Sequence, residues 1–148
     1  MSSARWNARV SAEMKVYVLD SFALLAYLGG EAGEPQVKSV LAEALAGQAE
    51  IYLSIINYGE IAYITQREQG VPAAQMAIAA MDQLPLHIVE ADRKLTLAAA
   101  YLKARYPISY ADAFAVALAR QVGATLLTGD PEFHEVEHLA AVEWLPKP

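Results

Sequence analysis

Short apolar runs of the kind that form buried β-strands alternate along this chain with segments of helical periodicity. The first such run, 15–19, ends at Asp20, and a helical segment follows at once. Parallel strands need crossover connections of this kind, because the chain must return to the same end of the sheet before the next strand begins. The alternation therefore predicts an α/β fold: a three-layer α/β/α sandwich with a mainly parallel central sheet.

Proline and glycine mark several of the expected helix ends. Pro35 lies near the start of one helix and Gly47 follows its end, while Gly123 follows the helix with the clearest pattern. Ser54 or Asn57 is the expected cap of the helix that runs to about 69. The predicted strands span 15–19, 50–53, 86–89, 124–127 and 141–144, and the other predicted helices span 21–28, 35–46, 72–83, 91–105 and 109–122.

The size and hydrophobicity of the chain suit one domain. It has 148 residues, of which 55% are hydrophobic, enough to bury a sizeable core. We expect residues 14–148 to form a single domain. Residues 1–13 lack the apolar core of a secretory signal and are predicted to be a disordered leader or tag. The longest apolar run, 16–28, is too short to span a bilayer, which takes roughly 20 residues, so no membrane interaction is expected.

Composition and missing motifs exclude several functional classes. The chain has no cysteine, which rules out disulfides, thiolate metal sites and cysteine nucleophiles, and the cytoplasm is the expected location. A formal net charge of -6 counts against a large non-specific nucleic-acid interface but allows a small catalytic one. Neither the G-x-S-x-G elbow nor a glycine-rich phosphate loop occurs, so serine hydrolases and nucleoside-triphosphate binding are set aside.

Four acidic residues lie close to points where a strand-like run gives way to a helix: Asp20, Glu60, Asp112 and Asp130. In an open α/β sheet, the strand ends that precede helices share one edge, so these side chains are expected to converge. Carboxylates held so close together repel one another unless a cation or bound protons compensate for their charge. Because oxygen ligands suit Mg²⁺ or Mn²⁺, the pattern predicts a divalent metal site that activates water for phosphodiester hydrolysis.

Each acid also has a purely structural explanation. Asp20 and Asp130 fit helix N-cap positions, and Glu60 stands three residues after Asn57, the spacing of a capping box. A cap needs only one oxygen acceptor, however, and Ser, Thr or Asn supplies it as well as Asp. The repeated choice of an ionisable acid favours the metal site.

The segments that carry these acids resemble a known family. In order and spacing they are similar to the PIN-domain ribonucleases, specifically the VapC-type toxins, and the resemblance covers residues 14 to about 145. The segments are VLDS at 18–21, Ser54 with NYGE at 57–60, SYADA at 109–113, and LTGDPEF at 127–133. Any one of these motifs alone is weak evidence for the family. The whole set, in this order and on a matching alternation of strands and helices, is specific evidence for it.

The resemblance implies a PIN-like fold and a Mg²⁺- or Mn²⁺-dependent endoribonuclease that leaves a 5′-phosphate. It further implies a homodimer that acts as the toxin of a VapBC-type pair and is inhibited by a VapB-type antitoxin. The implied catalytic and metal-binding quartet is Asp20, Glu60, Asp112 and Asp130, with Asp20 and Asp112 as the most direct ligands. Ser21 and Thr128 match positions whose hydroxyl groups support the site. Gly129 departs from the family, in which many members have Asn or Ser, and is expected to be harmless.

A few other residues were candidates for the site. Glu132 lies two positions after Asp130 and is a candidate fifth acid of the pocket, but the favoured interpretation is an exposed glutamate in the first turn of a helix. Arg105 with Tyr106 precedes the Asp112 segment and is a candidate RNA contact, although most basic residues are expected on solvated helix faces. No role in the site is assigned to the histidines, which are His87, His134 and His138.

Two other functions stay open at this point. A small metal-dependent phosphoryl-transfer domain, such as a receiver or a phosphatase, also gathers acids at strand ends. A receiver would need a lysine near the end of a late strand, where this chain has Thr128 and Asp130. The second alternative is a catalytically silent PIN-like interaction module, in which the acidic pocket receives an arginine of a partner protein.

Overall fold

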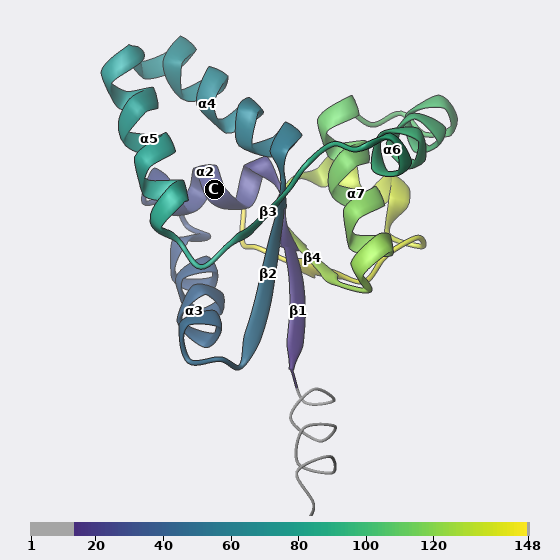
Figure 1. The fold of residues 1–148 in the computed structure, drawn as a ribbon, viewed down its shortest axis with the longest axis horizontal. Coiled ribbons are helices and arrows are strands. Elements are labelled where there is room, and N and C mark those ends of the chain that lie inside the picture. Colours follow the sequence, from purple (N-terminus) through teal and green to yellow (C-terminus); the bar gives the residue numbers. More distant parts are fainter. Residues whose placement is uncertain (1–13, 148) are drawn as a thin grey trace, which may run out of the picture.

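The computed structural model describes residues 14–147, so the predicted leader or tag at 1–13 lies outside the described residues. Within this range one parallel sheet has the strand order β3-β2-β1-β4-β5 (Figure 1). Its strands are β1 (Lys15–Leu19), β2 (Ala49–Ser54), β3 (His87–Val89), β4 (Thr125–Thr128) and β5 (Val142–Trp144). The expectation of a mainly parallel sheet is therefore confirmed, since every pairing is parallel.

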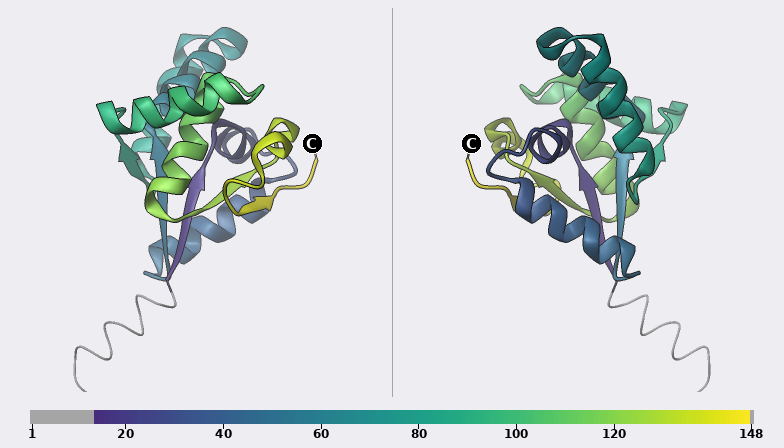
Figure 2. Two further views of the ribbon diagram at one scale, coloured as in Figure 1. Left: turned by 90° about the vertical axis from the view of Figure 1, so that its right-hand side faces the viewer. Right: turned by 90° about the vertical axis from the view of Figure 1, so that its left-hand side faces the viewer.

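Helices cover both faces of this sheet, which confirms the three-layer architecture (Figures 1 and 2). One face carries α2 (Ser21–Leu28), α3 (Glu34–Leu45), α4 (Ile55–Gln69) and α5 (Val71–Gln83). The other face carries α6 (Arg93–Arg105), α7 (Tyr110–Val122) and the short 3₁₀ helix η1 (Pro131–Val136). None of the helices within 14–147 is both long and apolar enough to cross a membrane.

The central strands are buried on both sides, and alternate residues enter different cores. Val18 packs with residues of α6 and α7, whereas Leu19 packs with residues of α2 and α3. Leu126 and Leu127 of β4 divide between the two cores in the same way. This is the period of two that a strand imposes, and it explains why the runs in the sequence are continuously apolar.

Helix α7 is the most deeply buried helix. Every residue from 111 to 119 is buried, and alanine occupies every second position of that stretch. These small side chains let α7 pack closely against α6 and α4 as well as the sheet. Asp112, in the first turn, is therefore drawn into the interior together with its apolar neighbours.

The strand order places a topological switch point at the carboxyl ends of β1 and β4, and we call this region the crevice. From β1 the chain builds outward to β2 and β3 on one side, and it later adds β4 and β5 on the other side. Ligands of open α/β sheets bind where the direction of winding reverses in this way, beyond the carboxyl ends of the strands. A functional site is thus expected among the residues that follow β1 and β4.

Candidate metal centre

Asp20, Thr128 and Asp130 lie at this crevice and are connected by hydrogen bonds. Asp20 follows β1 directly, and Thr128 is the last residue of β4. The Thr128 hydroxyl donates to Asp20 Oδ2 and accepts a hydrogen bond of 3.0 Å from the backbone N–H of Asp130. Asp20 and Thr128 are fully buried. Thr128 therefore links the two aspartates, and its supporting role in the site stays a prediction.

Asp112 reaches the same crevice from the first turn of α7. Ser109 caps this helix, with its Oγ accepting from the Asp112 backbone N–H at 3.1 Å. In a capping box, the Asp112 carboxylate would accept the backbone N–H of Ser109 in return. Here Glu132 Oε1 accepts that N–H instead. Because Glu132 takes over this part of the cap, the Asp112 carboxylate is available for a ligand.

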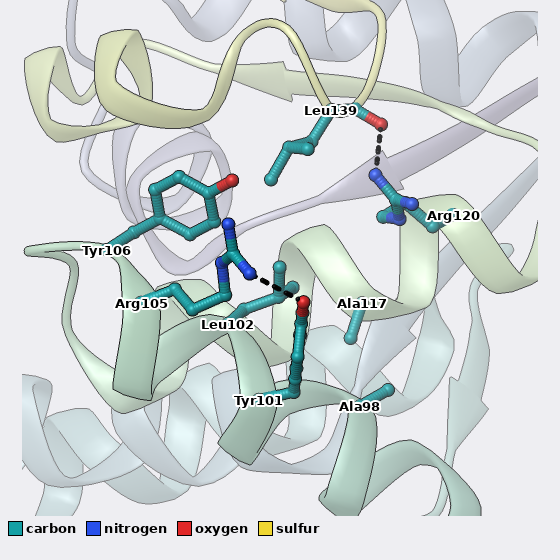
Figure 3. A pocket seen from close by; sticks show the side chains of 8 residues that line it. All are labelled: Ala98, Tyr101, Leu102, Arg105, Tyr106, Ala117, Arg120 and Leu139. Atoms are coloured by element: carbon teal, nitrogen blue, oxygen red, sulfur yellow. Dashed lines mark hydrogen bonds between the residues drawn. The ribbon is translucent and has the colours of Figure 1, made fainter.

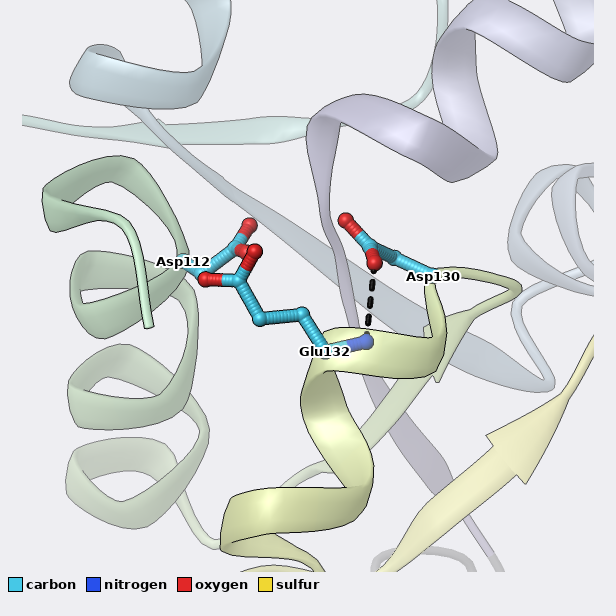
Figure 4. A group of neighbouring side chains, drawn as sticks. All are labelled: Asp112, Asp130 and Glu132. Atoms are coloured by element: carbon cyan, nitrogen blue, oxygen red, sulfur yellow. Dashed lines mark hydrogen bonds between the residues drawn. The ribbon is translucent and has the colours of Figure 1, made fainter. Parts of the chain in front are cut away.

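Asp112, Asp130 and Glu132 form a compact carboxylate cluster (Figure 4). One oxygen from each lies within 4.8 Å of the others. The Asp130 carboxylate also accepts the Glu132 backbone N–H at 2.9 Å, which holds the start of η1 against the crevice. Three carboxylate oxygens at this separation match the hard oxygen donors that Mg²⁺ and Mn²⁺ bind. The residues present therefore fit the implied cation.

The electrostatics of the site point the same way. Burial raises the pKa of Asp20 to about 7, although its hydrogen bonds from Thr128 and Ala23 lower it. Burial, together with the charges of Asp20, Asp130 and Glu132, raises the pKa of Asp112 to about 8. Both shifts disfavour the ionised form, so without a cation the site retains protons near neutral pH. A divalent cation would remove this penalty by compensating the negative charge.

Glu60 is less closely tied to the cluster than the sequence pattern suggested. It lies in the second turn of α4, six residues beyond the end of β2, and is half-buried. It is not part of the three-carboxylate cluster of the described residues. The capping-box explanation for Glu60 is nevertheless wrong, because Ser54 and not Asn57 caps α4. Its membership of the quartet stays a prediction.

Asn57 joins the two chain segments that carry Asp20 and Asp112. Its Nδ2 donates to Ser21 Oγ at 3.1 Å and to the carbonyl oxygen of Ala111 at 3.3 Å. Ser21 follows Asp20 and Ala111 precedes Asp112, so this buried amide sets the distance between α2 and α7. Its Oδ1 has no partner among the described residues, a loss of about 1–3 kcal/mol for a buried polar atom. Ser21 is thus connected through Asn57 to the segment that carries Asp112, and its supporting role stays a prediction.

Glu132 and Asn57 show what the sequence pattern missed. The interpretation of Glu132 as an exposed residue is wrong, because it is half-buried and belongs to the cluster. One local signal could have indicated this: Pro131 favours a tight turn directly after Asp130, which holds Glu132 near the end of β4. No local signal indicates the contact of Asn57 with Ala111, which are 54 residues apart.

Gly129, the departure from the family pattern, is explained by its neighbour Phe22. A Cβ atom at position 129 would collide with the Phe22 ring, which packs against this loop. Glycine therefore lets an aromatic side chain lie directly beside the residues that connect Thr128 to Asp130. An Asn or Ser at this position would require Phe22 to move.

Comparison with solved structures shows the same fold in VapC-type proteins. VapBC2 from Rickettsia felis, bound to a DNA fragment from the promoter, aligns with a TM-score of 0.70 and 17% identity over 88% of this chain and 99% of that chain. VapC20 from Mycobacterium tuberculosis, a Sarcin-Ricin loop cleaving toxin, gives a TM-score of 0.70 and 21% identity over 88% and 99%. DNA-bound VapBC from Salmonella typhimurium gives 0.70 and 14% over 88% and 98%.

Comparison of the sequence identifies a family but no curated relative. No curated protein matches the chain. The model of the PIN domain, by contrast, matches residues 17–139, a range that includes the acids, Thr128 and the Asn57 bridge. This match spans most of the sequence and agrees with the fold. The chain therefore belongs to the PIN domain family.

Proposed function

We propose that this protein is a Mg²⁺- or Mn²⁺-dependent endoribonuclease that acts in the cytoplasm as the toxin of a VapBC-type toxin–antitoxin pair. The observation that carries the proposal is the cluster of Asp112, Asp130 and Glu132 beside buried Asp20, at the crevice of a PIN fold. Supporting it, a protein of the same fold is described as a Sarcin-Ricin loop cleaving toxin.

In this proposal the acidic residues have different roles. Asp112, Asp130 and Glu132 hold the cation, while Asp20, fixed by Thr128, adds negative charge from the end of β1. Glu60 completes the pocket from α4. Carboxylate oxygens that do not hold the cation orient the attacking water and accept its proton. The bound cation supplies positive charge that stabilises the leaving oxygen and lowers the pKa of water.

The same comparison supports an antitoxin partner for the proposed toxin. Several solved structures of this fold are VapBC complexes, two of them with DNA. We infer that this chain is inhibited by a VapB-type antitoxin and forms a homodimer. A small adjacent reading frame with a DNA-binding amino-terminal half would support the pairing.

The proposal predicts RNA cleavage that requires a divalent cation. Purified protein should cut RNA in Mg²⁺ or Mn²⁺, stop when a chelator is added, and resume when excess cation is restored. Gel analysis of end-labelled RNA measures the rate, and phosphatase sensitivity of the product ends checks for the 5′-phosphate. Cleavage that continues unchanged in chelator would contradict the proposal.

A further inference from the structure

A hollow lies between α6, α7 and the segment after η1, with a volume of about 320 Å³ (Figure 3). Its polar lining consists of Arg105, Arg120, Tyr101 and Tyr106, and the remaining lining side chains are alanine and leucine. No carboxylate lines this hollow among the residues that the structure describes. We call it the arginine–tyrosine pocket.

Both arginines of the pocket are oriented by neutral oxygen atoms. Arg105 donates to the Tyr101 hydroxyl at 2.9 Å, and Arg120 donates to the carbonyl oxygen of Leu139 at 3.0 Å. Over the described range 14–147, neither guanidinium forms an ion pair. A guanidinium has five N–H donors, so each retains its charge and most of its donors for an anion. In a chain of net charge -6, this is a local site for a polyanion.

The pocket is connected to the carboxylate cluster by shared elements. Helix α7 carries Asp112 in its first turn and Arg120 eight residues later, which is about 12 Å along the helix axis. Tyr106 lies three residues before Ser109, whose N–H bonds to Glu132 of the cluster. Because residues 111–119 of α7 are buried, a single strand whose phosphate lies at the cluster would reach the pocket over the segment that joins α6 to α7, in which Pro107, Ser109 and Tyr110 are exposed.

We propose that the arginine–tyrosine pocket binds single-stranded RNA a short distance from the cleaved bond. This inference rests on the proposed ribonuclease function. The guanidinium groups contact a phosphate, and the exposed ring of Tyr101 stacks with a base. An acidic peptide is another polyanion that would meet the arginines. The tyrosine rings favour RNA, because every base has a face that stacks on an aromatic ring.

The chain supplies a matched control for this proposal. Arg105 lies over the ring of Tyr101, four residues earlier, at 5.4 Å, and Arg67 lies over the ring of Tyr63, also four residues earlier, at 5.7 Å. Arg67, however, belongs to α4, outside the pocket, and pairs with Glu68 at 3.8 Å. Arg105→Glu and Arg67→Glu therefore make the same change of charge beside a tyrosine of the preceding helical turn, and only Arg105→Glu alters the arginine–tyrosine pocket.

Binding of a fluorescein-labelled single-stranded oligoribonucleotide, measured by fluorescence anisotropy, tests the inference. An Asp20→Asn background in Mg²⁺ keeps the strand intact. Arg105→Glu should weaken binding roughly tenfold and reduce the slope of log affinity against log salt by about 1, because a phosphate contact is lost. Arg67→Glu should leave both unchanged. Tyr101→Ala should weaken binding several-fold with little change in the salt slope, as expected for stacking.

The possible outcomes distinguish failure of the proposal for the pocket from failure of the proposed ribonuclease function. If the parent protein cleaves RNA and Arg105→Glu does not change RNA binding, the proposed role of the pocket is wrong, while the proposed ribonuclease function stands. Equal weakening by Arg67→Glu would also overturn it, since only net charge would then matter. If the parent chain neither binds nor cleaves RNA, the proposed function itself fails. Equal thermal midpoints of the variants exclude misfolding as the cause.

Discussion

Replacing Asp112 or Asp20 by asparagine should lower RNA cleavage by roughly a thousandfold or more while the chain stays folded. Asparagine keeps the size and one oxygen of each side chain but removes the negative charge that the cation needs. The fold should tolerate the change, because both carboxyl groups have raised pKa values and are easily neutralised. Initial cleavage rates in saturating Mn²⁺, with circular dichroism as the check on folding, measure the effect.

Asp92 provides the control for Asp20. Each of these aspartates caps a helix by accepting a backbone N–H three residues later, Ala23 for Asp20 and Leu95 for Asp92. Asparagine caps helices about as well as aspartate, so both substitutions preserve the structural role. Only Asp20→Asn should abolish cleavage. Wild-type activity in Asp20→Asn would show that its carboxylate serves only the cap.

The metal-free protein should become less stable as the pH rises from about 5 to 8. Asp20 and Asp112 have pKa values of about 7 and 8 in the folded chain, compared with about 3.9 when unfolded. Between these values the folded chain binds more protons than the unfolded chain, so the free energy of unfolding falls with rising pH. Each kcal/mol lost would lower the thermal midpoint by about 2–4 °C, measurable by calorimetry in chelator.

Mn²⁺ should reverse this trend. At pH 8 protons compete less for the carboxylates than they do at pH 5, so the cation should raise the midpoint more at pH 8. In Asp112→Asn both the decline with pH and the gain from Mn²⁺ should shrink. A midpoint that changes equally in wild type and variant would mean that other groups cause the dependence on pH.

Most of the fold could be predicted from local patterns. Continuous apolar runs indicated the strands of the sheet, because strands between two helical layers are buried on both faces. The helix at Val71–Gln83 was expected from Pro72, and the structure begins it one residue earlier. A helix start after Asp130 was expected, and Asp130 does cap η1, but the extent of this 3₁₀ helix was not predicted. Its buried residues, Phe133 and Val136, gain their order from packing against the core of α6 and α7.

The prediction from strand ends holds for only part of the predicted site, and it is wrong for Asp112, because α7 follows α6 and no strand precedes it. Asp20 and Asp130 lie within two residues of β1 and β4, so the topology of the sheet alone brings them together. Glu60 lies further into its helix, and the same argument does not fix its position. Glu132 depends on a contact between η1 and Ser109, which no local spacing encodes.

Calorimetric titration of Mn²⁺ into the metal-free protein at pH 8 tests most directly whether these carboxylates share a cation. The account predicts saturable binding that Asp112→Asn weakens by about tenfold or more and that Asp92→Asn leaves unchanged. No heat of binding in the wild-type protein, or the same affinity in Asp112→Asn, would contradict it.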